Sequence, residues 1–89
     1  MSEDPDLVEA DRKIAASGIR AGQRFRHYKT HNIYTIDSVG VFEADLSPMV
    51  CYRLGGRIWY RALAVFTSQA IYNNTLVPRF VLVEDPALT

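Results

Sequence analysis

Aromatic residues and arginines recur at strand spacing between residues 20 and 80, in a stretch that holds few acidic residues. The runs that carry this pattern are short, and Gly, Asn and Pro residues separate them. Aromatic and β-branched residues in short runs between turn signals are typical of β-strands. The pattern therefore predicts a mainly β fold, in the form of a small SH3-like barrel of five to six antiparallel strands with an added N-terminal helix.

Turn signals set the expected borders of the strands. Gly55-Gly56 predicts a two-residue hairpin turn, because glycine enters positive φ freely at both positions. Asn73-Asn74 also tolerates positive φ and predicts a closing hairpin between residues 70–72 and 78–83. Residues 62–66 suit one helical or 3₁₀ turn. The remaining strands are expected at 23–29, 33–41, 49–54 and 57–61. An OB-fold is the main alternative, but it needs a longer helix between its third and fourth strands, and the sequence has no room for one.

Residues 4–17 are expected to form a short amphipathic helix. Asp4 can cap its N-terminus, Pro5 suits its first turn, and Gly18 is a natural stop. The apolar stripe is too narrow to stabilise the helix alone in water, so the helix must dock on another surface. The helix is expected to pack on the basic surface of its own barrel. The alternative is that it packs on the barrel of a second copy, which would give a dimer through the N-terminal helix. In the first case helix acids would face barrel arginines, with Asp6, Glu9 or Asp11 opposite some of Arg20, Arg24, Arg26 and Arg57.

Length and composition predict one globular domain over residues 1–89, with the helix at 4–17 and the barrel at 20–84. Hydrophobic residues make up 48% of the chain and charged residues 22%, which is typical of a globular protein. No apolar run reaches the length of about 18 residues that a membrane span needs, and no secretory signal is expected from the acidic start of the sequence. A single cysteine excludes an intrachain disulfide and fits a cytoplasmic location.

Zero net charge hides a strong charge asymmetry. Residues 18–83 contain eight basic residues against three acidic ones, which gives +5, whereas the two ends together carry −5. Eight of the ten basic residues are arginines, whose planar forks bind carboxylates and phosphates at two points. A basic, aromatic-rich middle favours an anionic partner, although arginine-rich codon usage would produce the same composition.

Trp59 and Arg61 are two residues apart on one expected strand, so their side chains share a face. An exposed tryptophan beside a guanidinium would make a flat platform next to a cationic fork. Trp59 could equally be the largest residue of the core. His27, between Phe25 and Tyr28, could be a site residue or a half-buried structural histidine.

Metal, cofactor and nucleophile signals are weak. His27 and His31 are four residues apart, a ligand spacing on helices, but here they fall in a strand and a turn. Gly55-Gly56 lacks the lysine and helix of a phosphate-binding loop. Cys51 is expected to be a half-buried, inert thiol, because no activating group is near it in sequence. The sequence therefore indicates no metal site, no cofactor and no catalytic residue.

The spaced residues resemble a bacterial family known as domain of unknown function 1653. The resemblance covers about two thirds of the chain, in order, and rests on Gly22, Phe25, His27-Tyr28-Lys29, Tyr34-Thr35-Ile36, Glu43, Val50-Cys51-Tyr52, Trp59-Tyr60-Arg61, Phe66 and Arg79-Phe80. It implies an SH3-like barrel and no established activity. Thr30-His31-Asn32 replaces a family glycine, only Glu43 remains of a family loop motif, and Ala62 replaces a family proline. Residues 4–17 lie outside the resemblance.

The polar residues of this pattern form the candidate site, because a barrel core does not require charged side chains at these positions. Either they pair with one another as a structural network or they line a pocket, with Glu43 the expected partner of Arg61 or Arg79. The full candidate set is His27, Lys29, Glu43, Tyr52, Trp59, Arg61 and Arg79.

Three functions are considered from these residues. The first is a non-catalytic binding module for a small planar or anionic ligand or a protein partner, with His27, Tyr52, Trp59 and Arg61 lining a shallow cleft. The alternative is a nucleic-acid-binding module, favoured by the basic middle and its interleaved aromatics. The third is a small enzyme in which His27 and Glu43 exchange a proton. No membrane partner is expected.

Overall fold

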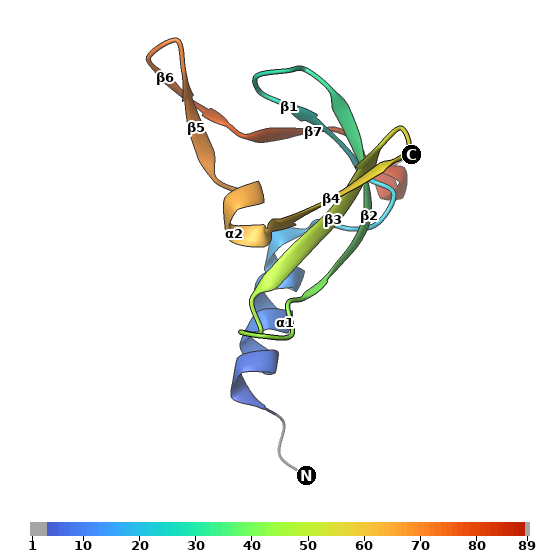
Figure 1. Cartoon of the computed structure of the whole chain (residues 1–89), viewed down its shortest axis with the longest axis vertical. Helices are drawn as coiled ribbons and strands as arrows, with labels where there is room; N and C mark the ends of the chain where they lie inside the picture. The colour runs from blue at the N-terminus through green and yellow to red at the C-terminus, as the bar shows by residue number, and fades with distance from the viewer. Residues whose placement is uncertain (1–3, 89) are drawn as a thin grey trace.

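Residues 4–88 are described by a computed structural model, and they form two antiparallel sheets with an N-terminal helix (Figure 1). Glu3, which contributes to the acidic N-terminal charge, lies outside these residues. The elements in chain order are α1 (Pro5–Ser17), β1 (Arg24–His27), β2 (Ile33–Val41), β3 (Pro48–Leu54), β4 (Arg57–Ala62), α2 (Leu63–Phe66), β5 (Gln69–Tyr72), β6 (Thr75–Pro78), β7 (Phe80–Glu84) and the 3₁₀ turn η1 (Pro86–Leu88). The fold is therefore mainly β, as the sequence predicts.

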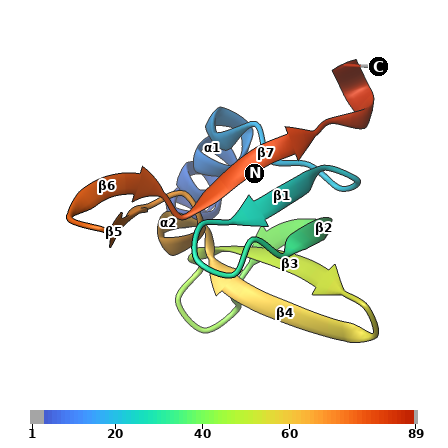
Figure 2. The same cartoon turned by 90° about the horizontal axis from the view of Figure 1, so that it is seen from above.

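The larger sheet contains five strands in the order β4-β3-β2-β1-β7 (Figure 2). Every neighbouring pair is antiparallel. The chain therefore runs as a meander from β1 to β4 and returns with β7 beside β1. Within residues 4–88 no ladder joins the two end strands, β4 and β7, so the sheet curls around the core without closing into a barrel.

The β5–β6 hairpin forms a separate two-stranded sheet that extends from the body as an arm (Figure 1). Asn73 and Asn74 adopt positive φ values of 54° and 62°, as a type I′ turn requires. The sequence predicted that residues 78–83 pair with residues 70–72, and this pairing was wrong. Strand β5 pairs with β6 instead, and β7 pairs with β1. The chain changes partners at Arg79, whose N–H donates to the Ser68 carbonyl oxygen at 3.0 Å.

The β3–β4 hairpin turns at Gly55-Gly56, as predicted, with Leu54 opposite Arg57. Only Gly55 has a positive φ, of 60°, so the expectation of positive φ at both glycines was wrong. One left-handed glycine at the first central position is the requirement of a type II′ turn, which matches the twist of the strands.

Helix α1 begins and ends where local signals place it. Asp4 Oδ1 accepts a hydrogen bond from the Asp6 N–H at 2.8 Å, and Pro5 occupies the first turn. Gly18 adopts a left-handed φ of 69° and donates its N–H to the Ala15 carbonyl oxygen. No helix among residues 4–88 is long and apolar enough to span a membrane.

Helix α1 docks on the β2–β3 hairpin through its small apolar stripe. Ala10 is buried, and Ile14 packs against the core. The expected pairing of helix acids with barrel arginines was wrong: Glu9 pairs with Arg12 of the same helix, and the other ion pairs of residues 4–88 are Arg20–Asp85, Arg24–Glu84 and Arg53–Asp37. The helix acids do not meet these arginines because the axis of α1 points away from the sheet instead of crossing its basic face (Figure 1).

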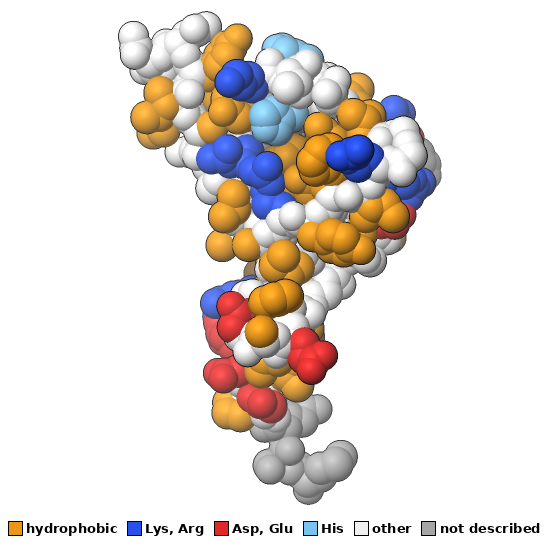
Figure 3. All heavy atoms as spheres, in the orientation of Figure 1, with side chains coloured by type: hydrophobic (Ala, Val, Ile, Leu, Met, Phe, Trp, Pro, Cys, Tyr) orange, Lys and Arg blue, Asp and Glu red, His pale blue; other side chains and the backbone are white. Residues whose placement is uncertain are grey.

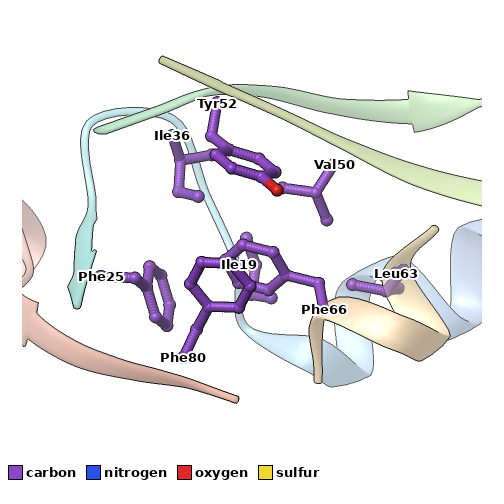
Figure 4. Packing of buried hydrophobic residues seen from close by; sticks show 8 residues of the cluster. All are labelled: Ile19, Phe25, Ile36, Val50, Tyr52, Leu63, Phe66 and Phe80. Atoms are coloured by element: carbon purple, nitrogen blue, oxygen red, sulfur yellow. The ribbon is translucent and has the colours of Figure 1, made fainter. Parts of the chain in front are cut away.

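The core lies between one face of the five-stranded sheet and α2 (Figure 4). Phe66 of α2 and Phe80 of β7 stack with their ring centres 4.1 Å apart, and Phe25 meets Phe66 edge-on. Strand alternation aims every second side chain at this face, which we call the core face. The buried cluster is Ile19, Phe25, Ile36, Val50, Tyr52, Leu63, Phe66 and Phe80.

A hydrogen-bond network of Arg20, Gln23 and Asp85, which we call the buried knot, joins the two ends of the sheet domain. Asp85 Oδ2 accepts hydrogen bonds from Gln23 Nε2 and Arg20 Nη2, both at 2.9 Å. Gln23 Oε1 in turn accepts from the Arg20 N–H at 2.8 Å. Gln23 and Asp85 are both buried, and their hydrogen bond gives each buried polar side chain a partner. The hydrogen bonds to Gln23 and Ala87 and the Arg20 charge together hold the pKa of Asp85 below its ordinary value.

Candidate functional site

Part of the core face is not covered by α2, and several of the predicted site residues lie there. Residues directly opposite each other in neighbouring strands share a face. Trp59 is opposite Tyr52, and Arg61 is opposite Val50. His27 is opposite Phe80. Because Val50, Tyr52 and Phe80 belong to the core, the side chains of His27, Trp59 and Arg61 extend the same face beyond it.

Arg61 is held in place by the aromatic core. Its Nε donates to the Tyr52 hydroxyl at 3.2 Å, and its guanidinium carbon lies 5.7 Å from the centre of the Phe80 ring. Tyr52 is only 3% exposed, so its hydroxyl orients Arg61 and offers little surface to a ligand. A guanidinium bound through Nε alone keeps its two terminal nitrogens for another partner.

His27 lies among aromatic rings and cations. Its ring centre is 4.7 Å from that of Tyr28 and 5.1 Å from that of Phe80. Its Nδ1 accepts from the backbone N–H groups of Lys29 at 3.2 Å and Thr30 at 3.4 Å. An accepting nitrogen carries no proton, which assigns the proton of the neutral ring to Nε2.

Burial lowers the pKa of His27 below its ordinary value, and the positive charges of Arg61, Arg79 and Lys29 lower it further. Both effects disfavour the charged imidazolium. His27 is therefore a neutral N–H donor near neutral pH. His27 and Arg61 both contact the Phe80 ring, His27 and Arg79 both contact the Tyr28 ring, and the Lys29 N–H donates to the His27 ring. We call His27, Lys29, Arg61 and Arg79 the basic cluster.

Arg79 joins the cluster from the link between β6 and β7. Its Nε donates to the Ser68 hydroxyl at 3.1 Å, and its guanidinium carbon lies 5.9 Å from the centre of the Tyr28 ring. Tyr28 in turn meets Tyr72 of the β5–β6 arm edge-on. The arm therefore helps to hold one side of the basic cluster.

No ion pair of residues 4–88 involves Lys29, Arg61 or Arg79, because the four pairs use Arg12, Arg20, Arg24 and Arg53. Figure 3 shows the resulting separation of charge, with basic side chains beside a histidine on the upper body and acidic ones gathered over α1. Hydrogen-bond donors without a local carboxylate make the basic cluster suited to an anion.

Trp59 is neither a core residue nor the partner of Arg61. It is 42% exposed, and the guanidinium carbon of Arg57, rather than that of Arg61, lies 5.7 Å from its ring centre. Arg57 precedes Trp59 by two residues, so the same alternation that linked Trp59 with Arg61 could have identified it.

Glu43 lies apart from the basic cluster. It is an exposed residue of the β2–β3 turn and lines a hollow of about 550 Å³ with Cys51 and Tyr60, which belong to the face opposite the core face. The expected ion pair of Glu43 with Arg61 or Arg79 is therefore wrong, and so is the acid–base pair of Glu43 with His27. Glu43 lies in the β2–β3 turn beside the face opposite the core face, whereas strand alternation places His27 and Arg61 on the core face.

Lys29 and Cys51 differ in how far they are exposed. Lys29 lies exposed in the turn after β1, and Cys51 is a half-buried free thiol. Two further hollows have volumes of about 620 and 290 Å³. No member of the basic cluster lines either of them or the hollow beside Glu43, so the cluster lies on the open surface. Within residues 4–88 no three His, Cys, Asp or Glu side chains come together as a metal site.

Sequence reasoning missed the aromatic support of the cluster. Tyr34 packs edge-on against Tyr52 at 5.3 Å and against Phe80 at 6.1 Å between ring centres. Tyr28 lies just after β1, which ends at His27, so the strand spacing does not set the direction of its side chain. Only the contact with Arg79, about 50 residues away in sequence, reveals its role.

Residues 23–82 match the family described as "Protein of unknown function (DUF1653)", and the chain belongs to this family. The match begins at Gln23 of the buried knot and ends inside β7, so it contains all four residues of the basic cluster. No curated protein and no solved structure matches the chain.

Proposed function

We propose that this member of the DUF1653 family is a non-catalytic binding module for a small, planar, anionic ligand, bound at the basic cluster. One observation carries the proposal: Arg61 and Arg79 flank His27 without a carboxylate partner, while four other arginines are paired. Unneutralised guanidinium groups fixed by Tyr52 and Ser68 are preorganised to bind an anion.

A planar group on the ligand is supported by the rings around the cluster. Tyr28 and Tyr34 are half-buried, and Trp59 exposes part of its indole on the same face. Flat rings beside cations favour ligands such as a nucleotide, a modified base or an aromatic carboxylate. In the same proposal the protein acts in the bacterial cytoplasm, where the free thiol of Cys51 stays reduced.

The experiment is a titration followed by the fluorescence of Trp59, the only tryptophan of the chain. Nucleotides, free bases, aromatic carboxylates and short acidic peptides are added to the wild-type protein and to three variants. Arg61→Ala and Arg79→Ala should each weaken binding roughly 10-fold or more, the usual effect of losing a charged hydrogen bond. Arg53→Ala removes the same charge from a guanidinium that is already paired with Asp37, and should change little.

Two results would overturn the proposal. One is the absence of any response from every ligand class at about 1 mM, a weak-binding limit near −4 kcal/mol. The other is binding that Arg53→Ala weakens as much as Arg61→Ala, because the affinity would then follow net charge and not the basic cluster.

A nucleic-acid strand is the second candidate ligand, and the segregation of charge favours it (Figure 3). A strand could follow the basic face and stack on Trp59, while the acids of α1 lower the overall affinity. Binding to single-stranded RNA or DNA should then fall steeply with salt, and removal of residues 1–17 should strengthen it. A gel shift that stays negative at low salt after this removal would exclude the candidate.

A further inference from the structure

Strand β4 is a regular edge of the five-stranded sheet, without a bulge or a proline. It ends the strand order, and Figure 2 shows it at the border of the sheet, away from the β5–β6 arm. All six of its residues pair with β3 without a register shift, whereas the β1–β7 and β2–β3 ladders each contain one. Natural edge strands are often blocked by proline, a bulge, very short length or charged side chains, and residues 57–62 have only the last of these, in Arg57 and Arg61. The outer backbone groups of β4 can therefore accept another strand.

The two faces of this edge differ in chemistry. Arg57, Trp59 and Arg61 lie on the core face, and neither arginine has an ion-pair partner among residues 4–88. Ile58 and Tyr60 lie on the opposite face and are 52% and 71% exposed. Tyr60 borders the hollow of about 550 Å³, whose lining is mainly apolar and includes Met49, Cys51 and Phe42.

We propose that β4 is a docking edge for an extended partner peptide in which acidic residues alternate with apolar ones. Side chains of an added strand alternate between the two faces of the sheet. Carboxylates on one face of the peptide would meet Arg57 and Arg61, and apolar side chains on the other would pack on Ile58, Tyr60 and the adjoining hollow. Backbone hydrogen bonds supply affinity in this mode of recognition, and the alternating side chains supply specificity.

A second copy of the chain fits this edge poorly. Two β4 strands paired antiparallel about Trp59 would place Arg57 directly opposite Arg61 of the partner, twice per dimer. Like charges directly opposite each other destabilise a strand pair. In the register centred on Trp59, the charge of the edge therefore favours an acidic partner strand over self-pairing.

The docking edge is separate from the small-ligand site, although Arg61 borders both. Arg57, Ile58 and Tyr60 are outside the basic cluster, and His27 and Arg79 belong to other elements, namely β1 and the link between β6 and β7. Arg79→Ala should therefore weaken small-anion binding roughly 10-fold or more and leave peptide binding intact. This variant makes the failure of one proposal distinguishable from the failure of the other.

The experiment uses a synthetic peptide of alternating Glu and Val, capped at both ends, and records backbone amide NMR shifts of the full-length protein. Binding should shift the amides of β3 and β4 and change the fluorescence of Trp59. Arg57→Ala should weaken binding roughly two- to five-fold, the range of one exposed charge pair. Arg26→Ala, at an exposed position of β1 that faces away from the core, is the matched control and should leave the affinity unchanged.

Two N-methylated peptides test the strand geometry itself. Alternate N–H groups of a strand point to opposite edges, so methylation of either the Glu or the Val amides should abolish binding while methylation of the other set leaves it largely intact. The proposal is overturned if both methylated peptides bind like the parent, if both lose binding equally, or if the parent peptide does not bind at about 1 mM. It is also overturned if the protein alone dimerises through β4, as seen by sedimentation and reversed by Tyr60→Arg.

Discussion

Single residues in this protein take their properties from neighbours that are distant in sequence. His27 is a neutral donor because it is buried and because Arg61 and Arg79 lie beside it. Tyr52 serves as a support for Arg61 and not as a ligand contact, because its ring is enclosed by Tyr34, Phe66 and Phe80. At this scale the side chain's environment, more than its type, determines its role.

His27 should make stability depend on pH in a defined window. Its pKa is lowered in the folded protein, whereas the unfolded chain titrates near 6.5. Above about pH 6.5 both states are neutral and no stability is lost; below it the unfolded state takes up the proton first, so stability falls as pH drops towards the folded pKa.

Urea unfolding of the wild-type protein between pH 7.5 and 5 measures this fall. His27→Gln should flatten the profile in that range, whereas the fall should persist in His31→Gln, a change at an exposed turn position. An unchanged slope in His27→Gln would show that another group is responsible.

Asp85 should stabilise the fold above about pH 4 and lose this effect in acid. Its pKa is lowered on folding, so the contribution is present above the unfolded value of about 3.9 and disappears as pH falls through the folded pKa. Asp85→Asn should lower the melting temperature at pH 7 by several degrees, because Gln23 and Arg20 lose the carboxylate that they share. Thermal unfolding at pH 7 and pH 3 measures both effects.

The neighbouring Glu84 provides the control for this prediction. It also pairs with an arginine, Arg24, but both side chains are about half exposed. Exposed pairs contribute only about 0–1 kcal/mol, so Glu84→Gln should leave the melting temperature nearly unchanged. Equal effects of the two substitutions would mean that burial of the Asp85 knot adds nothing.

Secondary-structure elements differ in how strongly they are tied to the sheet. The β5–β6 arm is a two-stranded hairpin, which is marginal on its own, and it is anchored by buried Ala70 and by the contact of Tyr72 with Tyr28. Helix α1 is anchored by Ala10 and Ile14, while Leu7 and Val8 remain largely exposed. Both elements are additions to a sheet that carries its own core.

Removal of residues 1–17 should therefore leave a folded sheet of lower stability. The apolar contacts of Ala10 and Ile14 are lost, at a cost of roughly 2 kcal/mol. Circular dichroism should keep its β-sheet signal, and melting should stay cooperative at a lower temperature. Loss of both would show that α1 belongs to the core. Sedimentation of the full-length and shortened proteins also tests the predicted dimer through the N-terminal helix, which requires residues 4–17.

The molecule as a whole separates its charges along its longest dimension of 49 Å. Acids lie on α1 at one end, and unneutralised arginines lie on the sheet at the other (Figure 3). The family match of residues 23–82 covers the basic end and omits α1 together with two residues of the buried knot, Arg20 and Asp85. The matched segment is thus shorter than the unit that packs as one body.

A fragment of residues 18–88 should fold, whereas a fragment of residues 23–82 should not. The shorter fragment lacks Ile19, a core residue, together with Arg20 and Asp85 of the knot. Loss of Ile19 alone costs roughly 2 kcal/mol, a large share of the stability of so small a domain. Amide NMR spectra of the two fragments make the comparison, and well-dispersed signals from residues 23–82 would refute it.

Local signals in the sequence were sufficient to predict where most helices, strands and turns begin and end. The caps at Asp4 and Gly18, the span of β2, the hairpin turns at Gly55-Gly56 and Asn73-Asn74 and the single helical turn at α2 were all predicted correctly. Each depends on interactions within a few residues: a cap, a permitted φ or an alternation of period two. The resemblance to the family rests on the same spaced residues, and the family match confirms it.

Tertiary structure alone decided how these elements meet. The break between β6 and β7 depends on hydrogen bonds from Arg79 to Ser68 and from Tyr28 to Arg79. The burial of Asp85 depends on Gln23, 62 residues earlier. Glu43 and Arg61 were expected to pair, yet Glu43 lies in the β2–β3 turn beside Cys51 and Tyr60, whereas Arg61 lies opposite Val50 on the core face. Such contacts join segments far apart in the chain, and the spacing of residues within one strand carries no information about them.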